Sequence, residues 1–469
     1  MQRMFNNMGR TGFGGHNLYV VAWLVLLLLV PAAYATQLPP EVNAVKVPIS
    51  LKVAVDLALK NNHQVKAFAY SVRAAGEDVG IARGNLLPNV GLEENFTRTN
   101  TPAYVFSSKL NQGRFTSGDL AGAPSTFNDP GYLNNYQTVF AVEQPIFEQK
   151  ASIGVTMAKD EFAAKSQEFE RKKEQIVFNV IQTFLMVQTA KEHVTVAASA
   201  VDDAKEHLRI SNSHYDANLG LYSDTLRAST AVKDAEQKLV SAQKNLDLAK
   251  RTIGMLLGRR ESIDVDGNIP AIKLRDIEYY TSVALSRKDL KAMQTRFDNA
   301  KKNVDLAHAA YLPVLGVRGA YQLDDQDAPF GSEGNSWLGS VFLRWDLFDG
   351  FRREHESSKA RHQVGQVREN LLELENAISY RVYEAYLSVN EAGKNAELSQ
   401  SAIKNAAEGQ RLVRSRYENS LSPLVDLLDT QIMLDNARAN AVAKENEYRL
   451  ALANLSFESG TITRDFNLE

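Results

Sequence analysis

Two carboxylates stand three positions apart shortly after a Ser-Pro pair, at Asp426 and Asp429. Residues three apart on a helix lie on one face, so these two side chains would present their charges together. In a narrow passage such charges concentrate cations and repel anions. A plainer interpretation also fits, because Ser422 is a natural N-cap and Pro423 a natural first helical residue. Acidic residues near a helix start are favoured by the helix dipole in any case, so both interpretations stay open on these residues alone.

Residues for metal, phosphate or covalent chemistry lack the spacing that such chemistry needs. The histidine pairs with helical spacing are seven positions apart, roughly 10 Å along a helix, which one metal ion cannot bridge. These pairs are His207–His214 and His355–His362. We expect them to be solvated or to lie in a helix seam. No Gly-rich phosphate loop precedes a helix and no motif surrounds a Ser-His-Asp combination, so we expect no enzyme, metal or cofactor.

Composition is that of a folded protein. The chain has 469 residues, a net charge of −3, 44% hydrophobic and 23% charged residues, and no cysteine. Length alone favours two or three domains. The near-neutral charge gives no reason to expect nucleic acid as a partner. The lack of cysteine excludes disulfides, thiolate metal sites and a lipid-modified N-terminal Cys.

The N-terminus is typical of a secretory signal peptide. Arg3 and Arg10 precede an apolar run over 18–30, and Ala33-Tyr34-Ala35 forms a cleavage site. About 13 apolar residues are too few for a membrane-spanning helix. We therefore expect a signal peptide over 1–35 and an extended leader over 36–47. No other stretch resembles a transmembrane helix, so a membrane part would have to consist of β-strands.

The chain is organised around a long helix predicted over 149–219. Large residues recur there every seventh position, and a small residue follows each after three positions. This pattern is a heptad seam that lets helix backbones approach closely. The large residues are Val180, Val187, Val194, Val201, Leu208 and Tyr215, and the small ones are Thr183, Ala190, Ala197, Ala204 and Ser211. We expect assembly interfaces to bury the large residues of this seam.

The pattern repeats 202 positions further on, over a second long helix at 350–418. Leu87 recurs as Leu312, 225 positions on, whereas Phe147 recurs as Phe348, only 201 positions on. The first copy thus carries 24 extra residues (225 minus 201) between its strands, an insertion typical of an exposed loop. The duplication divides the mature chain into a first repeat (48–257), an equatorial connector (258–276), a second repeat (277–460) and a tail (461–469).

Each repeat contains two stretches with the period-two alternation of half-buried strands. We expect strands over 88–99, 136–147, 313–323 and 336–348, a loop over 100–135, and helices over 222–257 and 423–458 after the long ones. Aromatic residues at the strand ends would suit the two interfaces of a membrane, although an ordinary sheet core also uses them. These residues are Trp337, Trp345, Phe348 and Phe147. Four strands cannot close a barrel alone, and open strand edges are not tolerated in lipid, so closure would need several chains.

The order of these elements, their duplication and the tip sequence from Tyr417 to Asp429 resemble the TolC family of outer-membrane efflux proteins. The resemblance covers about 48–460. It implies a mainly α-helical homotrimer, in which long antiparallel coiled-coil helices form a periplasmic α-barrel. Four strands per chain would build a twelve-stranded β-barrel in the lipid of the outer membrane. It also implies an equatorial belt near 261–276 and in the tail.

By this resemblance, Asp426 and Asp429 would form two stacked rings of carboxylates that close the periplasmic end. Tyr417 matches an aromatic that helps to hold the closed state, and its first-repeat equivalent is Tyr215. Asp224 is equivalent to Asp426 and would support the gate across helices. Ser422 stands where some members carry a basic residue, which argues against a salt-bridge latch there, although arginines lie within two turns.

The resemblance further implies a periplasmic adaptor and an inner-membrane transporter of the RND or ABC type. The adaptor would dock on the hairpin tips, at Asn218, Leu219, Gly220, Ser420, Leu421, Ser422 and Pro423. We therefore expect an exit duct for efflux or secretion of solutes. Two rival interpretations are a periplasmic coiled-coil scaffold without a channel, and a general diffusion porin whose pore ignores the two aspartates.

Overall fold

The computed structural model describes residues 48–122 and 124–468, and the signal peptide and leader lie outside the described residues. These described residues form one compact unit. The first repeat contains α2 (Leu51–Asn61), α3 (His63–Gly84), β1 (Asn89–Thr99), α4 (Pro102–Asn111), α5 (Ser117–Leu120), α6 (Pro124–Asn128), β2 (Leu133–Phe147), α7 (Gln149–Asp216) and α8 (Tyr222–Leu256). No helix among these described residues is both long and apolar enough to cross a membrane.

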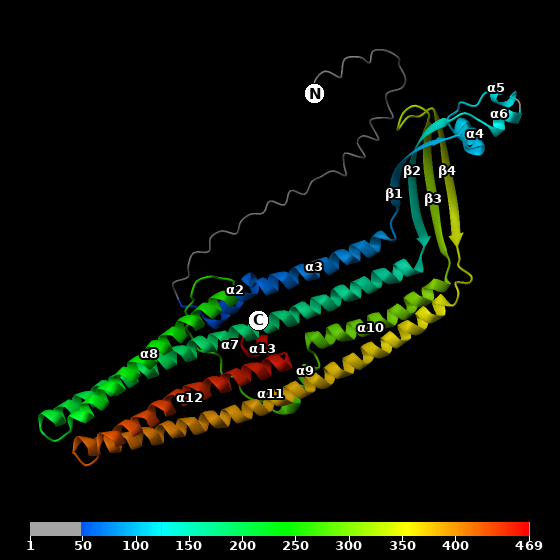
Figure 1. Cartoon of the computed structure of the whole chain (residues 1–469). Helices are drawn as coiled ribbons and strands as arrows, with labels where there is room; N and C mark the ends of the chain where they lie inside the picture. The colour runs from blue at the N-terminus through cyan, green and yellow to red at the C-terminus, as the bar shows by residue number, and fades with distance from the viewer. Residues whose placement is uncertain (1–47, 123, 469) are drawn as a thin grey trace, which may run out of the picture. The chain divides into compact units, whose positions relative to one another are not determined.

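The second repeat follows the same plan without the helical insertion (Figure 1). Its elements are α9 (Ile277–Ala284), α10 (Lys288–His308), the 3₁₀ helix η1 (Ala309–Tyr311), β3 (Val314–Asp325), β4 (Gly334–Arg344), α11 (Arg352–Glu418) and α12 (Leu424–Ser459). The tail contains the short helix α13 (Ile462–Asp465). The strand β4 ends earlier than the alternation suggested, so Trp345 and Phe348 follow the strand.

The four strands form one antiparallel sheet in the order β1-β2-β3-β4, which leaves β1 and β4 at its edges. Their register places Leu92, Phe140, Tyr321 and Trp337 in one row across all four strands. All four are exposed in the single chain. The neighbouring positions carry Glu93, Gln322 and Ser336 toward the opposite face, because side chains alternate along a strand. The sheet thus has one apolar, aromatic face and one largely polar face.

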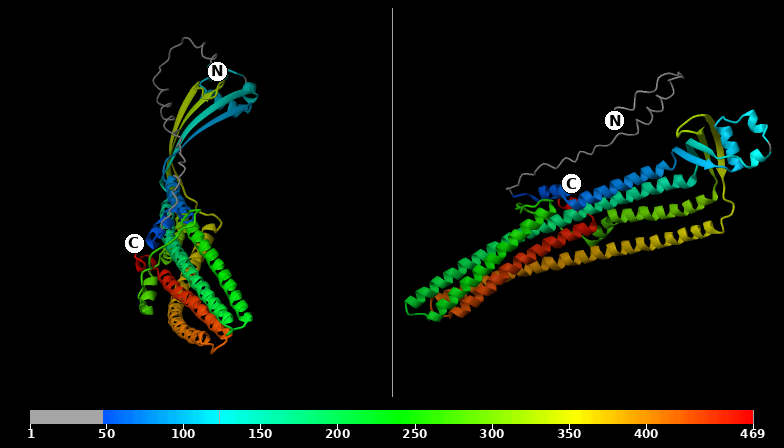
Figure 2. Two further views of the ribbon diagram at one scale, coloured as in Figure 1. Left: turned by 90° about the vertical axis from the view of Figure 1, so that its left-hand side faces the viewer. Right: turned by 45° about the horizontal axis from the view of Figure 1, so that its top comes forward.

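The long helices connect the sheet to the hairpin tips. At 68 residues, α7 extends about 100 Å. Its N-terminal part lies beside α3 and α10, and its C-terminal part beside α8 and α12, so α7 lies in the middle of the helical layer. Figure 2 shows α7–α8 and α11–α12 as two hairpins that run side by side. The helix α11, 67 residues long, contacts α10 and then α12.

Much of the heptad seam is buried within the single chain, which corrects the expectation that assembly would bury all of it. Val180 and Val187 in α7, and Val382 and Val389 in α11, are fully covered by helices of the same chain. A heptad pattern shows that a residue is buried but does not say which helix covers it. At the tip, Tyr215 lies outside this seam altogether, because its side chain is exposed and packs against the ring of Tyr222.

The expected loop over 100–135 contains the three short helices α4, α5 and α6, so that prediction was wrong. Pro102 begins α4 as its first residue, and Thr116 and Asp119 form a reciprocal capping box around α5. The buried Gln112 donates to the backbone oxygen of Asn134 and so ties α4 to the outer end of β2. The inserted segment is therefore a small folded cap on the sheet.

Candidate functional site at the hairpin tips

The two hairpins end in the same turn. Asn218 and Ser420, which are 202 positions apart, both adopt a left-handed conformation, with φ of 56° and 57°. In each tip the next amide donates back to the last helical turn: Leu219 N to His214 O and Leu421 N to Arg416 O, both at 2.8 Å. This arrangement satisfies carbonyls at a helix end. The duplication thus preserves the geometry of both tips.

A small apolar core joins the two tips. It contains one or more residues from each of the four long helices: Ile210 of α7, Ala228 of α8, Tyr417 of α11, and Leu424 and Leu427 of α12. Burial of these side chains stabilises the two hairpins against each other. The core also determines which face of α12 is left open.

Asp426 and Asp429 lie on the face of α12 that points away from this core, and both are exposed. The Ser422 hydroxyl donates to the Asp426 carboxylate at 2.8 Å. Ser422 is therefore not the N-cap, contrary to the sequence-based expectation, and Pro423 occupies that position with an extended ψ of 161°. Because the helix begins one residue later than expected, the serine side chain reaches another side chain instead of the first amides.

Asp429 lines a groove of about 490 Å³ between α8 and α12. The positively charged Arg227 and Lys238 of α8 line the same groove, as do Asp234 and Asp435. Among the described residues no ion pair joins Asp429 to either cation. The Asp429 carboxylate is thus available to attract cations from solution, in a groove that both positive and negative side chains line.

Tyr417 and Asp224 lie close enough at the tip for the charge of Asp224 to act on the tyrosine. Tyr417 is buried and its ring centroid lies 5.0 Å from that of His214. Burial raises the pKa of Tyr417, the neighbouring Ser211 hydroxyl partly offsets this rise, and the negative charge of Asp224 adds to it. Asp224 itself is half-buried in the first turn of α8. Tyr417 therefore belongs to the packing between the hairpins.

Sequence reasoning missed a buried polar network just above the tip core, centred on Gln431 of α12. Its amide nitrogen donates to Asp203 of α7 at 3.1 Å and to Asp435 at 3.0 Å. Its oxygen accepts from Gln410 of α11 at 3.0 Å and lies 3.2 Å from Nε2 of the buried His207. One side chain therefore connects three helices.

Charged residues extend this network. Arg438 lies 3.1 Å from Asp203 and 3.6 Å from Asp435, so it bridges α12 and α7. Burial raises the pKa of Asp435, and the nearby Asp203 contributes to the rise. Nearer the tip, Arg414 pairs with Glu418 of its own helix at 2.9 Å and lies 3.5 Å from Glu206 of α7. Such half-exposed pairs contribute little each, but together they cross-link the hairpins.

Both tips expose leucines beside the polar residues of their turns. Leu219 and Leu221 of the first tip, and Leu421 of the second, are each about two-thirds exposed. Because exposed apolar surface marks protein–protein contact sites when it is contiguous, these leucines are candidates for such a site. Figure 1 shows the turns of both hairpins, where the docking residues were expected, at the same end of the helical part.

The predicted membrane-interface aromatics lie in two places, on the sheet and at its junction with the helices. Trp337, 80% exposed, belongs to the aromatic row across β1–β4, whereas Trp345, Phe348 and Phe147 are exposed near the helices. The Trp345 indole nitrogen donates to the backbone oxygen of Tyr311 at 3.0 Å, which fixes its ring at this junction.

A four-stranded sheet joined to duplicated helices of this length defines a class of channel proteins. The chain belongs to the outer membrane efflux protein family, which it matches over residues 54–259 and 280–461. Protein CyaE of Bordetella pertussis is 24% identical over 463 residues, which span 93% of this chain and 92% of that protein. Outer membrane protein TolC of Salmonella enteritidis is 16% identical over 417 residues, spanning 86% and 80%.

Solved structures share the fold. The CmeC outer membrane channel of Campylobacter jejuni matches with a TM-score of 0.71 at 17% identity, covering 88% of this chain and 86% of that one. The resemblance drawn from the sequence is thus confirmed. The protein is an outer-membrane exit duct for efflux or secretion, with most of its chain in the periplasm, and proteins of this family are not enzymes. Channels of this family are trimeric and work with adaptor and inner-membrane pump partners.

Proposed function

We propose that three copies of this chain close one duct, in which the second hairpin tip of each copy supplies the periplasmic gate. The sheet supports the threefold closure, because β1 and β4 end it with unpaired edges. Such edges are not tolerated in lipid unless another strand pairs with them. Joining β4 of one copy to β1 of the next would give twelve strands with the aromatic row facing lipid.

The helical layer also has two uncovered sides. Apolar side chains are exposed along α11, at Tyr380, Leu387 and Leu398. Another exposed set, Val240, Leu248 and Met255, follows α8 at intervals of seven or eight residues. Scattered exposed apolar residues are normal, but a row at helical spacing is typical of an interface between helices. Each set would meet the other on the neighbouring copy.

The observation that carries the gate is the placement of Asp426 and Asp429, because both are exposed at the narrow end of the hairpin while Leu424 and Leu427 hold the helix from behind. Tripled by symmetry, the carboxylates would form two rings that attract cations and repel anions. The exposed leucines at the tips would dock a periplasmic adaptor, and an inner-membrane transporter of the RND or ABC type would supply energy.

Single-channel conductance of the detergent-purified trimer in planar bilayers tests this proposal. We expect the Asp426→Asn/Asp429→Asn variant to lose cation selectivity and to change conductance at least twofold. Asp216→Asn, which removes an exposed carboxylate at the other tip, is the matched control and should leave selectivity unchanged. A pore indifferent to the double substitution would refute the gate, and a folded protein without any pore would favour the scaffold interpretation.

A further inference from the structure

The two repeats contain the same joint. There a helix that comes from the hairpin tip, called the lower helix (α8 or α12), ends against the start of a helix that leads to the sheet, called the upper helix (α3 or α10). In the first repeat the Asn62 amide nitrogen donates to the backbone oxygen of Leu256, the last residue of α8, at 2.8 Å. In the second, Arg287 donates to the backbone oxygen of Glu458, near the end of α12, also at 2.8 Å. Each donor occupies the N-cap position of the upper helix, α3 or α10.

The residues of the two joints occupy equivalent positions in the two repeats, which are offset by 225 positions before the strands and by 202 after them. Arg287 follows Asn62 by 225 positions, and Glu458 follows Leu256 by 202. Gly258 and Gly460, also 202 apart, both have a positive φ, of 72° and 76°. A Cβ on Gly258 would lie 2.7 Å from the Asn61 oxygen. Both joints thus need a glycine to let the lower helix end and a side-chain donor to bind its carbonyl.

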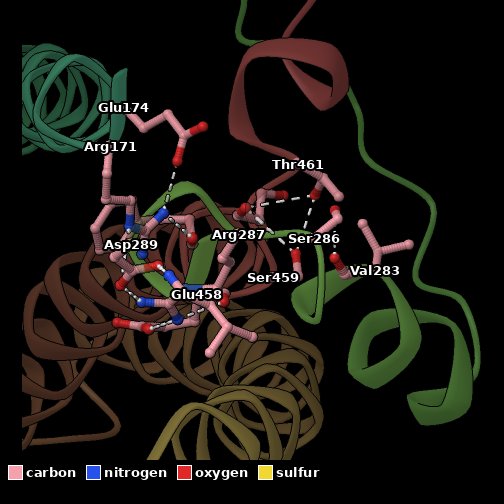
Figure 3. A network of polar contacts seen from close by, with 12 residues as sticks. Arg171, Glu174, Val283, Ser286, Arg287, Asp289, Glu458, Ser459 and Thr461 are labelled. Atoms are coloured by element: carbon pink, nitrogen blue, oxygen red, sulfur yellow. Dashed lines mark hydrogen bonds and ion pairs between the residues drawn. The ribbon is translucent and has the colours of Figure 1, made fainter. Parts of the chain in front are cut away.

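The second joint differs from the first because it is built from buried charges (Figure 3). The Arg287 side chain is 2% exposed and forms a two-pronged pair with Asp289, at 3.1 and 2.7 Å. It also binds the Glu458 carboxylate at 2.9 Å. Burial alone would lower the pKa of Arg287, yet the hydrogen bonds and charges of Asp289 and Glu458 raise it.

A second buried arginine connects this joint to α7. Arg171 lies 3.8 Å over the ring of Phe457, donates to the Phe457 backbone oxygen at 2.9 Å, and pairs with Glu174 at 2.8 Å. Its guanidinium is 3.9 Å from Asp289, so the two arginines share that carboxylate. The cluster therefore joins α7, the start of α10 and the end of α12.

We infer that the ion cluster around Arg287 fixes the angle at which the α11–α12 hairpin leaves the upper helices, and so sets the resting position of its tip. The 36 residues of α12 form a lever of about 54 Å, and a 5° rotation at the joint would move the tip by about 5 Å. An arginine fork holds two carboxylates in one geometry, whereas the single neutral hydrogen bond of Asn62 does not. The effect of the tip position on transport rests on the proposed gate, whereas the structural role of the joint does not.

Spin-label distances within the trimer test this inference, because the chain has no cysteine of its own. Ser415 and Ser213 are exposed near the second and first tips and are equivalent by the 202-residue offset. Each is changed to cysteine in turn and labelled. Arg287→Asn copies the residue of the first joint. We expect it to shift or broaden the distances between Ser415 labels by roughly 3–5 Å, as the lever predicts, with a smaller change at Ser213.

Arg296→Asn is the matched control, since Arg296 also joins α10 to α7, through Glu161 and Glu168, but does not contact the end of α12. Unchanged Ser415 distances in an intact Arg287→Asn trimer would overturn the inference, as would an equal shift in the control. If Arg287→Asn does not assemble, Arg287→Lys replaces it, because lysine keeps the charge but cannot form two parallel hydrogen bonds to a carboxylate. The distances between Ser415 labels must then shift in Arg287→Lys. A shifted tip with unaltered conductance would keep the joint and refute the gate.

Discussion

Replacing Gln431 by leucine should loosen the contact between the two hairpins without removing volume from it. Gln431 is 5% exposed and makes four polar contacts with α7, α11 and α12. Leucine would leave the buried Nε2 of His207 without a partner, and its Nδ1 already has none. An unsatisfied buried group costs about 1–3 kcal/mol, and lost hydrogen bonds to carboxylates cost about as much again.

The losses do not add in full, because Asp203 keeps Arg438 as a partner and lies near water. We therefore expect a local destabilisation of about 2–4 kcal/mol. Amide hydrogen exchange measures it directly, since a local opening reports the free energy of that region. Exchange in the tips of α7, α11 and α12 should accelerate about 30- to 700-fold, at roughly tenfold per 1.4 kcal/mol.

Gln237→Leu provides the control, because Gln237 is exposed on α8 and the same change of side chain there should leave exchange at the tips unaltered. The reasoning is refuted if Gln431→Leu exchanges like the wild type throughout the tips. It is refuted equally if the acceleration is spread over the whole chain, because the network would then stabilise the fold in general and not the contact between hairpins.

Two further predictions concern the joint and the cap. Gly258→Ala should lower the thermal unfolding midpoint, because a left-handed conformation costs a non-glycine residue about 1–2 kcal/mol and the new Cβ would contact the Asn61 oxygen. Gly80 of α3 has open space around it. Gly80→Ala should therefore raise the midpoint, because alanine stabilises a helix by up to about 1 kcal/mol relative to glycine. In the cap, hydrogen bonds from Lys109 and Thr116 lower the pKa of Asp119 from 3.8 to about 2. The stability that this carboxylate contributes is therefore complete above about pH 4 and is lost as the pH falls through about 2. Pepsin cleavage within 100–130 should rise over that window, and at higher pH in Lys109→Met; cleavage that is identical in both proteins would contradict the assignment.

Much of the fold could be predicted from local periodicity. The period of seven in α7 and α11, and the alternation in β1 to β4, reflect which side of an element is covered, and that information is present at each position. The register agrees with the alternation, since Val90 and Leu92 of β1 pair with Val142 and Phe140 of β2. The repeat offsets even relate individual turns, such as those at Asn218 and Ser420.

The features that could not be predicted depend on contacts between distant positions. His207 and Gln431 are 224 residues apart, and no local pattern around either indicates the other. The helices of the cap are short, and α4 is held by a buried bond from Gln112 to a strand 22 residues away. Composition alone made that segment look like a loop, because the glycines and prolines that punctuate short helices also punctuate loops.

The difference between the two tips follows from how the repeats diverged. The turn residues, the joint glycines and the aromatics Tyr215 and Tyr417 occupy equivalent positions, so the backbone plan is the same in both hairpins. The charged residues, in contrast, differ between the two hairpins. Asp224, equivalent to Asp426, is half-buried beside Tyr417, and Arg227 stands where the second repeat has Asp429. Among the described residues, the start of α12 therefore presents two exposed carboxylates where α8 has a half-buried carboxylate and an arginine. At the joints, the buried Arg287 stands where the first repeat has the neutral Asn62. A duct that must move one hairpin of each pair to open would need this combination: one tip that carries the charge, and a charged joint that sets where that tip rests.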